Sequence, residues 1–338
     1  MASCHQVDDV GILALCCKEN QDQNSYRTIL ELNLSSTSVT EISIKTILQS
    51  EPHIRILSLA ALQCEQQLLF NQTYIESTKL SHLDVSHNNI TDSSIQNICR
   101  LFPLLVELSI NCCPQLTSKS LEAISKLKHL QCFNMAQYGF ESQISFLSDV
   151  VPFLQKCGLK LQTLNLSSLH GVDTSFLAFH CPELSKLSLA DCVDITGRHL
   201  KSKSLEGGVA TLTQACRNLR YLDLQNGQFT SSFSTAEHMA AMIGATSRLK
   251  ELNLARIKGL TDECFEQSLL SSDLTSLTSL DLSYCSELSA ECAEYILHSC
   301  SSLSSLNLSH CKLITLQNAE SLRRISEKNR RAVKIIWA

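Results

Sequence analysis

Residues 300–315 read CSSLSSLNLSHCKLIT and contain a pattern from which the fold can be predicted. Leu303, Leu306 and Leu308 form the pattern Leu-x-x-Leu-x-Leu, with Cys300 three residues before it and Cys311 three residues after it. The end of the pattern alternates apolar and polar side chains, which is typical of a half-buried strand. The stretch therefore predicts a short β-strand that buries its leucines and is followed by a turn.

The pattern recurs along the chain when Ile, Val, Phe or Met is allowed at the leucine positions. Its eleven occurrences begin at Ile29, Ile54, Leu80, Leu105, Leu130, Leu161, Leu184, Leu219, Leu249, Leu277 and Leu303. The spacings average about 27 residues, and a period in this range indicates stacked structural repeats. Apolar residues at helical spacing follow, such as Ile95 and Ile98 after the N-cap signal Thr91-Asp92. The predicted fold is an α/β solenoid with parallel strands on the concave face and helices on the convex face.

The cysteines occupy two positions of the repeat. One position lies three residues after the last apolar residue of a strand and holds Cys113, Cys192, Cys285, Cys311 and also Asn88. The other lies three residues before the next strand and holds Cys181, Cys216 and Cys300. After the strand, the chain turns inward and a small side chain can bond the backbone of the neighbouring turn. We therefore predict buried, reduced, structural thiols.

These features resemble the cysteine-containing class of leucine-rich repeats, with the motif Cys-x-x-Leu-x-x-Leu-x-Leu-x-x-Cys-x-x-Leu-Thr/Ser-Asp. Residues 300–315 show it nearly complete, and residues 181–196 show it again with Gly197 in place of the Asp. The resemblance covers roughly residues 4–320 and implies a ribonuclease-inhibitor-like horseshoe. The class is best known from F-box substrate receptors of cullin–RING ubiquitin ligases and from antagonist-of-mitotic-exit-network proteins. It thus implies a protein-interaction scaffold in or related to such a ligase.

Three segments are expected: residues 1–28 as a half-repeat or cap, 29–320 as about eleven repeats, and 321–338 as a basic cap. An F-box usually opens near a Leu-Pro pair, which this chain lacks. Either the half-repeat caps the array, or the sequence is a piece of a longer protein with an F-box upstream that would bind a cullin-ligase adaptor. Without an F-box, the alternative function is a repeat-only adaptor with no ubiquitin-ligase coupling.

The carboxyl end breaks the repeat pattern. Its basic residues are Arg323, Arg324, Lys328, Arg330, Arg331 and Lys334, and the segment ends in the apolar run from Val333 to Trp337. The last repeat of a solenoid exposes the edge of its core, so we predict a helix over that edge followed by a strand-like segment. The alternative is a basic tail for a membrane or a nucleic acid.

Composition narrows the function classes. The 338 residues carry 28 Lys and Arg against 33 Asp and Glu, a net charge of −5 that argues against a dedicated nucleic-acid binder. No apolar run approaches the roughly 20 residues of a membrane-spanning helix. An odd count of 17 cysteines without a secretion signal favours a reducing compartment, so we expect a cytoplasmic or nuclear protein.

No motif predicts catalysis, a metal or a cofactor. The sequence contains no Cys-x-x-Cys, His-Glu-x-x-His or Gly-x-Ser-x-Gly, and Gly207-Gly208 is an isolated pair rather than a phosphate loop. We therefore expect a protein that is not an enzyme and needs no cofactor. The alternative is a hydrolase whose catalytic residues come together only in the fold.

The strands predict a candidate binding surface, because alternate residues face outward from the sheet. The candidate partner-binding residues on this concave face are Glu31, Asp84, Glu107, Asp191, Tyr221, Asp223, Glu251, Asp281 and Tyr284. The seven acids among them outnumber Lys186 and Arg256, the basic residues assigned to the same face. One interpretation is a partner with a basic segment, anchored by the two tyrosines. The other is that small polar residues simply fit crowded strands and bond to their neighbours. The long loops near 198–208 and 226–236 are further candidates.

Overall fold

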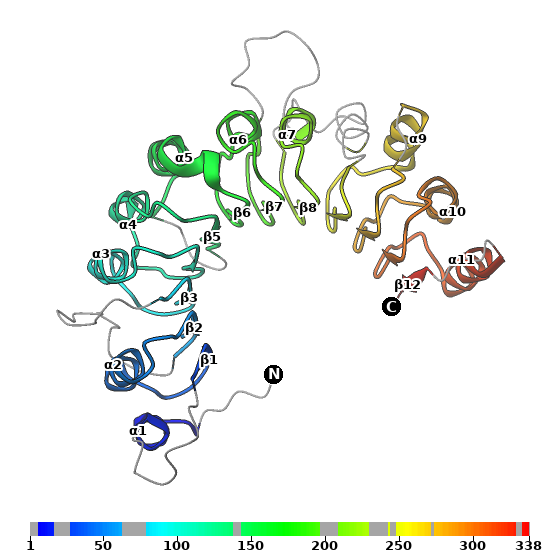
Figure 1. Ribbon diagram of the computed structural model, residues 1–338. Coiled ribbons are helices and arrows are strands. Elements are labelled where there is room, and N and C mark those ends of the chain that lie inside the picture. The colour runs from blue at the N-terminus through cyan, green and yellow to red at the C-terminus, as the bar shows by residue number, and fades with distance from the viewer. Residues whose placement is uncertain are drawn as a thin grey trace. The chain divides into compact units, whose positions relative to one another are not determined.

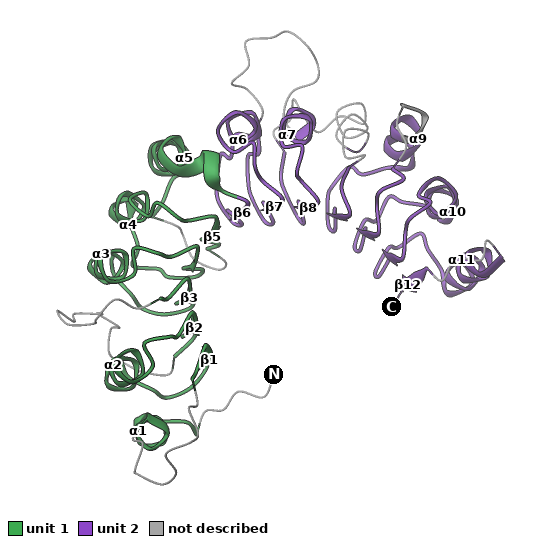
Figure 2. Ribbon diagram, viewed as in Figure 1, with its two compact units in different colours: residues 1–161 green, residues 162–338 purple. Residues whose placement is uncertain are grey.

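The computed structural model describes residues 6–16, 28–62, 79–137, 143–196, 209–229, 243, 248–271, 274–328 and 333–337. The chain divides into two compact units, residues 1–161 and 162–338, which Figure 2 colours separately. In each unit the strands form a parallel sheet in chain order, and the helices lie on one side of it (Figure 1). The fold is that of an α/β leucine-rich-repeat solenoid.

The strands lie where the leucine pattern predicts them. Unit 1 contains β1 (Glu31–Asn33), β2 (Ile56–Ser58), β3 (His82–Asp84), β4 (Glu107–Ser109) and β5 (Cys132–Asn134). Unit 2 contains β6 (Thr163–Asn165), β7 (Lys186–Ser188), β8 (Tyr221–Asp223), β9 (Glu251–Asn253), β10 (Ser279–Asp281), β11 (Ser305–Asn307) and β12 (Lys334–Ile336). Each of the first eleven begins two residues after its pattern begins, which confirms the prediction.

The helices follow the strands. Unit 1 contains α1 (Asp9–Cys16), α2 (Glu41–Ser50), α3 (Asp92–Leu101), α4 (Ser118–Ile124), the π-helical turn η1 (Phe146–Val150), α5 (Val151–Cys157) and the 3-10 turn η2 (Gly158–Lys160). Unit 2 contains α6 (Thr174–His180), α7 (Val209–Ala215), α9 (Asp262–Ser271), α10 (Ala290–Ser299) and α11 (Leu316–Lys328). Among the described residues, no helix combines the length and the apolar character needed to cross a membrane.

The core of each unit lies between its strands and its helices. The middle residue of a strand points into it: Leu57 and Leu83 pair in register in unit 1, as Leu187 and Leu222 do in unit 2, and all four are at most 1% exposed. Burying one such leucine contributes roughly 1.5–3 kcal/mol. The residues on either side of the middle one point away from the helices. We call the surface they form the strand face.

A ladder of small polar side chains joins successive repeats inside this core. The thiols of Cys113, Cys192, Cys285 and Cys311 donate to the carbonyl oxygens of Val85, Leu166, Leu254 and Leu282 of the preceding repeat, with S···O distances of 3.5, 3.3, 3.4 and 3.2 Å. Asn88 does the same from its Nδ2, 2.7 Å from the Leu59 oxygen. The predicted role of this repeat position is confirmed.

Thiol labelling of the native protein tests this packing. All 14 described cysteines are thiols rather than disulfides, and all are buried except Cys99 and Cys132, which are intermediate. Burial raises the pKa of the Cys113, Cys192 and Cys285 thiols to about 12, which keeps the reactive thiolate scarce at neutral pH. We expect a thiol reagent to modify few cysteines in native protein and all 17 after denaturation. Rapid modification of most thiols without denaturant would contradict the packing. Cys4, which we expect to react, lies outside the described residues.

An aspartate at the start of a helix joins it to the next repeat. Asp92, the first residue of α3, accepts hydrogen bonds from Thr117 N at 2.9 Å, from Thr117 Oγ1 at 2.6 Å and from Ser120 Oγ. Asp9 binds Thr40 and Ser43 in the same way. Thr91 is the N-cap of α3, as the Thr91-Asp92 signal predicted, so Asp92 is not itself the capping residue of its own helix. Its carboxylate holds the cap of the following helix instead.

At the carboxyl end of unit 2, α11 and β12 continue the two layers. β12 pairs with β11 in parallel register, and Trp337 donates from Nε1 to the Ile314 oxygen at 3.0 Å. Arg323 also turns inward, because its guanidinium donates to the Ile335 oxygen at 3.3 Å. These contacts match the helix and strand-like segment expected over the last repeat. Arg330 and Arg331 lie outside the described residues.

Candidate functional site

The last residue of a strand has a local structural role. In unit 1, Asp84 Oδ1 accepts from Ser86 N at 3.0 Å, which fixes the turn that ends β3. The same bond is made by Asn33, Asn165, Asp223, Asn253, Asp281 and Asn307. Asparagine makes this bond as well as aspartate does. The turn therefore explains the small polar side chain, but it does not require the negative charge.

The three candidate acids of unit 1 lie on its strand face. Glu31 begins β1 and is exposed, and Asp84 ends β3. Glu107 begins β4 opposite His82, and His82 Nε2 lies 3.9 Å from its Oε2. Both side chains are more than a third exposed, so this pair contributes at most about 1 kcal/mol.

Unit 2 brings Tyr221, Asp223 and Glu251 together. Tyr221 pairs with Lys186 on one side and with Glu251 on the other, and all three are the first residues of their strands. Asp223 Oδ2 accepts from Ser188 Oγ at 3.2 Å and from Tyr221 Oη at 3.4 Å. Burial raises the pKa of Asp223 despite these hydrogen bonds. Glu251 is exposed, whereas Tyr221 and Asp223 are half-buried.

Both carboxylate oxygens of Asp281 accept hydrogen bonds. It accepts from Ser283 N at 2.8 Å through Oδ1 and from Asn307 Nδ2 at 2.8 Å through Oδ2. A lysine here would remove both bonds, and a lysine at Asp223 would remove the equivalent turn. Replacement of Asp281 with asparagine preserves the Oδ1 acceptor of the turn but removes the charge and the acceptor for Asn307 Nδ2.

Asp191 and Tyr284 lie in the turns after β7 and β10 rather than in the strands. Each has a positive φ, 56° for Asp191 and 61° for Tyr284. Other residues at the same repeat position are Ser36, Ala61, His87, Cys112, Ser168, Asn226, Arg256 and His310. We use the name turn row for the residues at this repeat position in unit 2, which are Ser168, Asp191, Asn226, Arg256, Tyr284 and His310. Asn226 Nδ2 donates to Asp191 Oδ1 at 2.8 Å, so Asp191 is bonded along this row.

The turn row contains a stack of three side chains that the sequence did not reveal. The guanidinium carbon of Arg256 lies 4.1 Å from the centroid of the Tyr284 ring. The ring of His310 stacks on Tyr284 at 4.4 Å with an interplanar angle of 29°. Tyr284 remains 44% exposed between them. The sequence did contain a signal for this stack. The three residues are 28 and 26 residues apart, and each spacing equals one repeat, which places them in successive repeats.

A metal centre and a surface groove are two further kinds of site to consider in the described part of the chain. No group of three or more His, Cys, Asp or Glu is arranged to hold a metal there. A groove of unit 1 between α3 and α4 is lined by Cys99, Arg100, Lys119, Glu122 and Lys126, without a paired nucleophile and base. The loop at 198–208, residues 138–140 and most of 226–236 lie outside the described residues.

Comparison with known proteins agrees with this structure. The family model described as "Leucine Rich repeat" matches residues 76–99, 273–297 and 299–320. These three segments are therefore leucine-rich repeats by sequence, in agreement with the solenoid fold. A structure titled "Crystal structure of Rad7 and Elc1 complex in yeast" is similar with a TM-score of 0.56 and 16% identity, over 92% of this chain and 81% of that chain.

A second structure, the mouse RP105/MD-1 complex, has a TM-score of 0.44 and 15% identity, over 89% of this chain and 60% of that chain. At these identities the likeness concerns the fold alone. No curated protein matches the chain. The repeats and the fold support a protein-interaction scaffold.

Proposed function

We propose that this scaffold recognises a partner protein with a basic segment through the strand face and turn row of unit 2. The observation that carries the proposal is that two features occur together. The strand face carries negative charges that the turns do not require, and Tyr284 is exposed while it stacks with Arg256 and His310. Tyrosine and arginine are among the residues most enriched in binding hot spots. Opposite charges across the interface would steer the encounter.

The finer proposal is that the scaffold presents substrates to a cullin–RING ubiquitin ligase. Its support is the resemblance of residues 300–315 and 181–196 to the cysteine-containing repeats of F-box substrate receptors. The alternative is a repeat-only adaptor with no ligase coupling. For either function we propose a protein of the cytoplasm or the nucleus, because the described cysteines are thiols rather than disulfides.

Affinity purification from cells followed by mass spectrometry separates these two functions. We expect the full-length protein to recover a cullin and its adaptor together with a substrate that carries a Lys- and Arg-rich segment. Partners recovered reproducibly without any cullin or adaptor would contradict the ligase proposal and favour the repeat-only adaptor.

Charge neutralisation tests the acidic strand face. We expect the combined variant Asp223→Asn, Glu251→Gln and Asp281→Asn to associate with the recovered partner about tenfold more slowly at low salt, and to lose most of the salt dependence. Asn keeps the turn acceptors and loses the acceptor for Asn307 Nδ2, so the melting temperature should fall by only a few degrees. The matched control is Glu263→Gln, Glu287→Gln and Glu291→Gln, which removes three exposed acids of unit 2 outside the strands. Equal slowing in both variants, or none in either, would exclude the strand face.

A further inference from the structure

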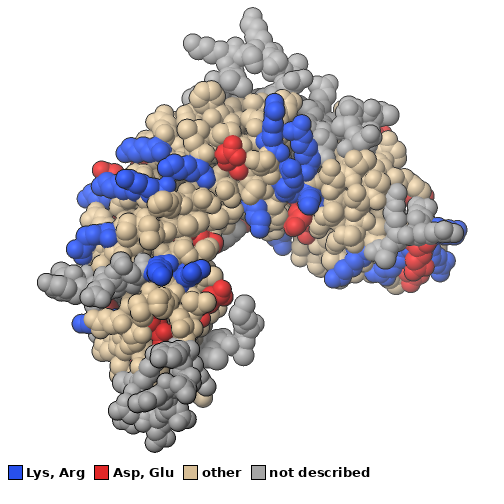
Figure 3. Space-filling model, in the orientation of Figure 1, with Lys and Arg blue, Asp and Glu red and all other residues tan. Residues whose placement is uncertain are grey.

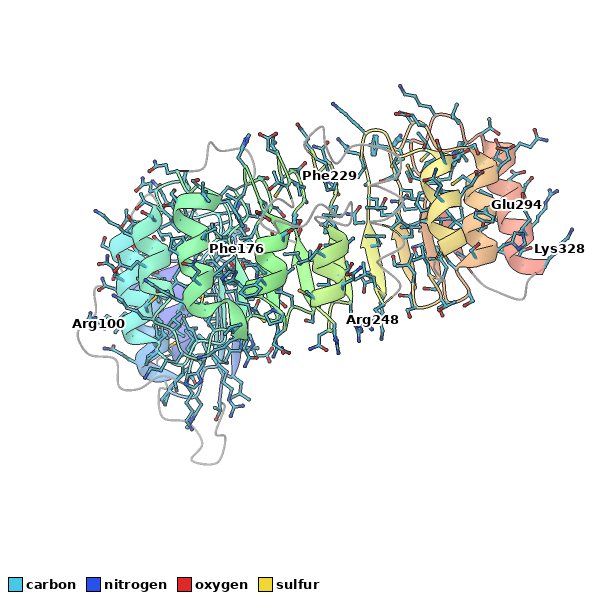
Figure 4. The ribbon with its side chains drawn as sticks, turned by 90° about the horizontal axis from the view of Figure 1, so that it is seen from above. Arg100, Phe176, Phe229, Arg248, Glu294 and Lys328 are labelled. Atoms are coloured by element: carbon cyan, nitrogen blue, oxygen red, sulfur yellow. The ribbon has the colours of Figure 1, made fainter. Side chains whose placement is uncertain are left out.

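Unit 2 also contains a group of exposed basic residues that the proposed function does not use. Arg217 and Arg220 precede β8, and Arg248 and Lys250 precede β9. All four side chains are exposed. We call this group the basic edge. Figure 3 shows Lys and Arg side chains gathered over the region of α7 and β8, and Figure 4 shows Arg248 at the edge of the ribbon.

The fold places these charges next to one another. The backbone oxygen of Arg220 accepts from Lys250 N at 2.8 Å and from Glu251 N at 3.0 Å, so Arg220 and Lys250 are neighbours across β8 and β9. Adjacent parallel strands lie about 4.8 Å apart. Like charges at such neighbouring positions destabilise a sheet. The folded protein therefore does not benefit from placing two cations there.

The basic edge has no acidic partner within the described part of the chain. The ion pairs found there are His82 with Glu107 and His298 with Glu294. Glu183, in the equivalent loop before β7, receives a hydrogen bond from Asn218 at 3.0 Å. The positive charges thus remain available to a ligand.

One of the cations is held in place. Nη1 of Arg220 donates to the backbone oxygens of Arg217 and Leu219, both at 3.0 Å. A guanidinium fixed by two backbone acceptors loses less conformational entropy when it binds a carboxylate or a phosphate. This arrangement favours a specific contact over diffuse charge.

We propose that the basic edge binds an acidic segment of a partner protein. Glu251 follows Lys250 directly, and Asp223 and Glu251 lie on the neighbouring strand face. A continuous polyphosphate crossing the basic edge meets these acids, whereas a peptide can place its carboxylates over the four cations alone. The net charge of −5 also disfavours a nucleic acid. This surface is separate from the strand face and does not depend on the function proposed for it.

The test uses the full chain and two probes, a fluorescein-labelled deca-glutamate peptide and an oligouridylate of the same length, in fluorescence anisotropy at two salt concentrations. We expect the peptide to bind more tightly than the oligouridylate. The variant Arg220→Glu with Lys250→Glu should lose about tenfold in peptide affinity. The control Lys258→Glu with Lys312→Glu carries the same charge change in turns after β9 and β11 and should lose less than about twofold.

Three results would overturn the proposal. The first is no peptide binding by the wild type, and the second is an equal loss of peptide affinity in both variants. The third is that the wild type binds the oligouridylate more tightly than the peptide and that Arg220→Glu with Lys250→Glu abolishes this oligouridylate binding. If that variant does not fold, Arg220→Gln with Lys250→Gln removes the charges without reversing them. Its expected loss is about threefold, against none for Lys258→Gln with Lys312→Gln. Binding of the basic partner segment at the strand face is measured separately, so either surface can fail alone.

Discussion

The variant Asp92→Ala should lose about 2–4 kcal/mol of unfolding free energy, because three donors of the following repeat lose their acceptor. Ser120 is fully buried and its hydroxyl donates to Asp92, so the substitution removes the acceptor of a buried donor. Thr117 loses two bonds at once, from its backbone N and its hydroxyl. Urea unfolding measures the loss, and hydrogen exchange should place it at α4. Asp92→Asn keeps one acceptor and should lose about half as much.

Glu122→Ala is the matched control for Asp92→Ala. Glu122 is an exposed acid of α4, and its removal should change the stability by less than about 0.5 kcal/mol. A loss for Glu122→Ala as large as that for Asp92→Ala would show that general charge, not the inter-repeat hydrogen bonds, stabilises this interface.

Acid should remove the difference between wild type and Asp92→Ala. Burial alone would raise the pKa of Asp92, but hydrogen bonds from Ser120 and Thr117 outweigh it and lower the pKa below 3.8. A carboxyl group with a lowered pKa stabilises the fold fully above its unfolded value and loses that contribution as the pH falls through the folded value. The difference in unfolding free energy should therefore be constant above about pH 5 and shrink below pH 4. A difference that does not change between pH 7 and pH 3 would contradict this account.

Sequence reasoning succeeded where the signal lies within one repeat. Leu303, Leu306 and Leu308 determine a strand and its buried face locally, so every strand of the pattern could be located. Cys311 could be assigned because its position relative to Leu308 recurs. The π-helical turn at Phe146–Val150 could not, because it belongs to a single repeat and leaves no periodic signal.

Contacts between repeats were harder to predict. Thr91-Asp92 is a cap signal by local rules, but the bonds of Asp92 reach Thr117, 25 residues later. Local rules cannot distinguish an aspartate that caps its own helix from one that holds the next cap. The stack of Arg256, Tyr284 and His310 was missed for the same reason. Each residue lies in a different repeat, and only the register of the repeats brings them together.

The candidate binding residues divide in the same way. Alternation along a strand correctly placed Tyr221, Asp223 and Glu251 on one face. It did not place Asp191 and Tyr284, because both lie beyond the strand in a turn with positive φ. The backbone of such a turn points its side chain along the edge of the sheet, where the neighbouring repeats supply the contacts.

Tyr284→Ala should weaken binding of the recovered partner about 30-fold, or about 2 kcal/mol, which is the level of a hot spot. Arg256 and His310 hold the ring from both sides while leaving 44% of the residue exposed, so little side-chain entropy is lost when a partner covers it. The fold should lose the exposed cation–π contact with Arg256 and the stacking with His310, together about 1–2 kcal/mol. Calorimetric titration and thermal unfolding measure the two effects. Tyr295→Ala, which removes a 36% exposed tyrosine from α10, should leave binding unchanged. Full partner affinity in folded Tyr284→Ala would mean that the stack only rigidifies the turn row, and that the partner binds elsewhere.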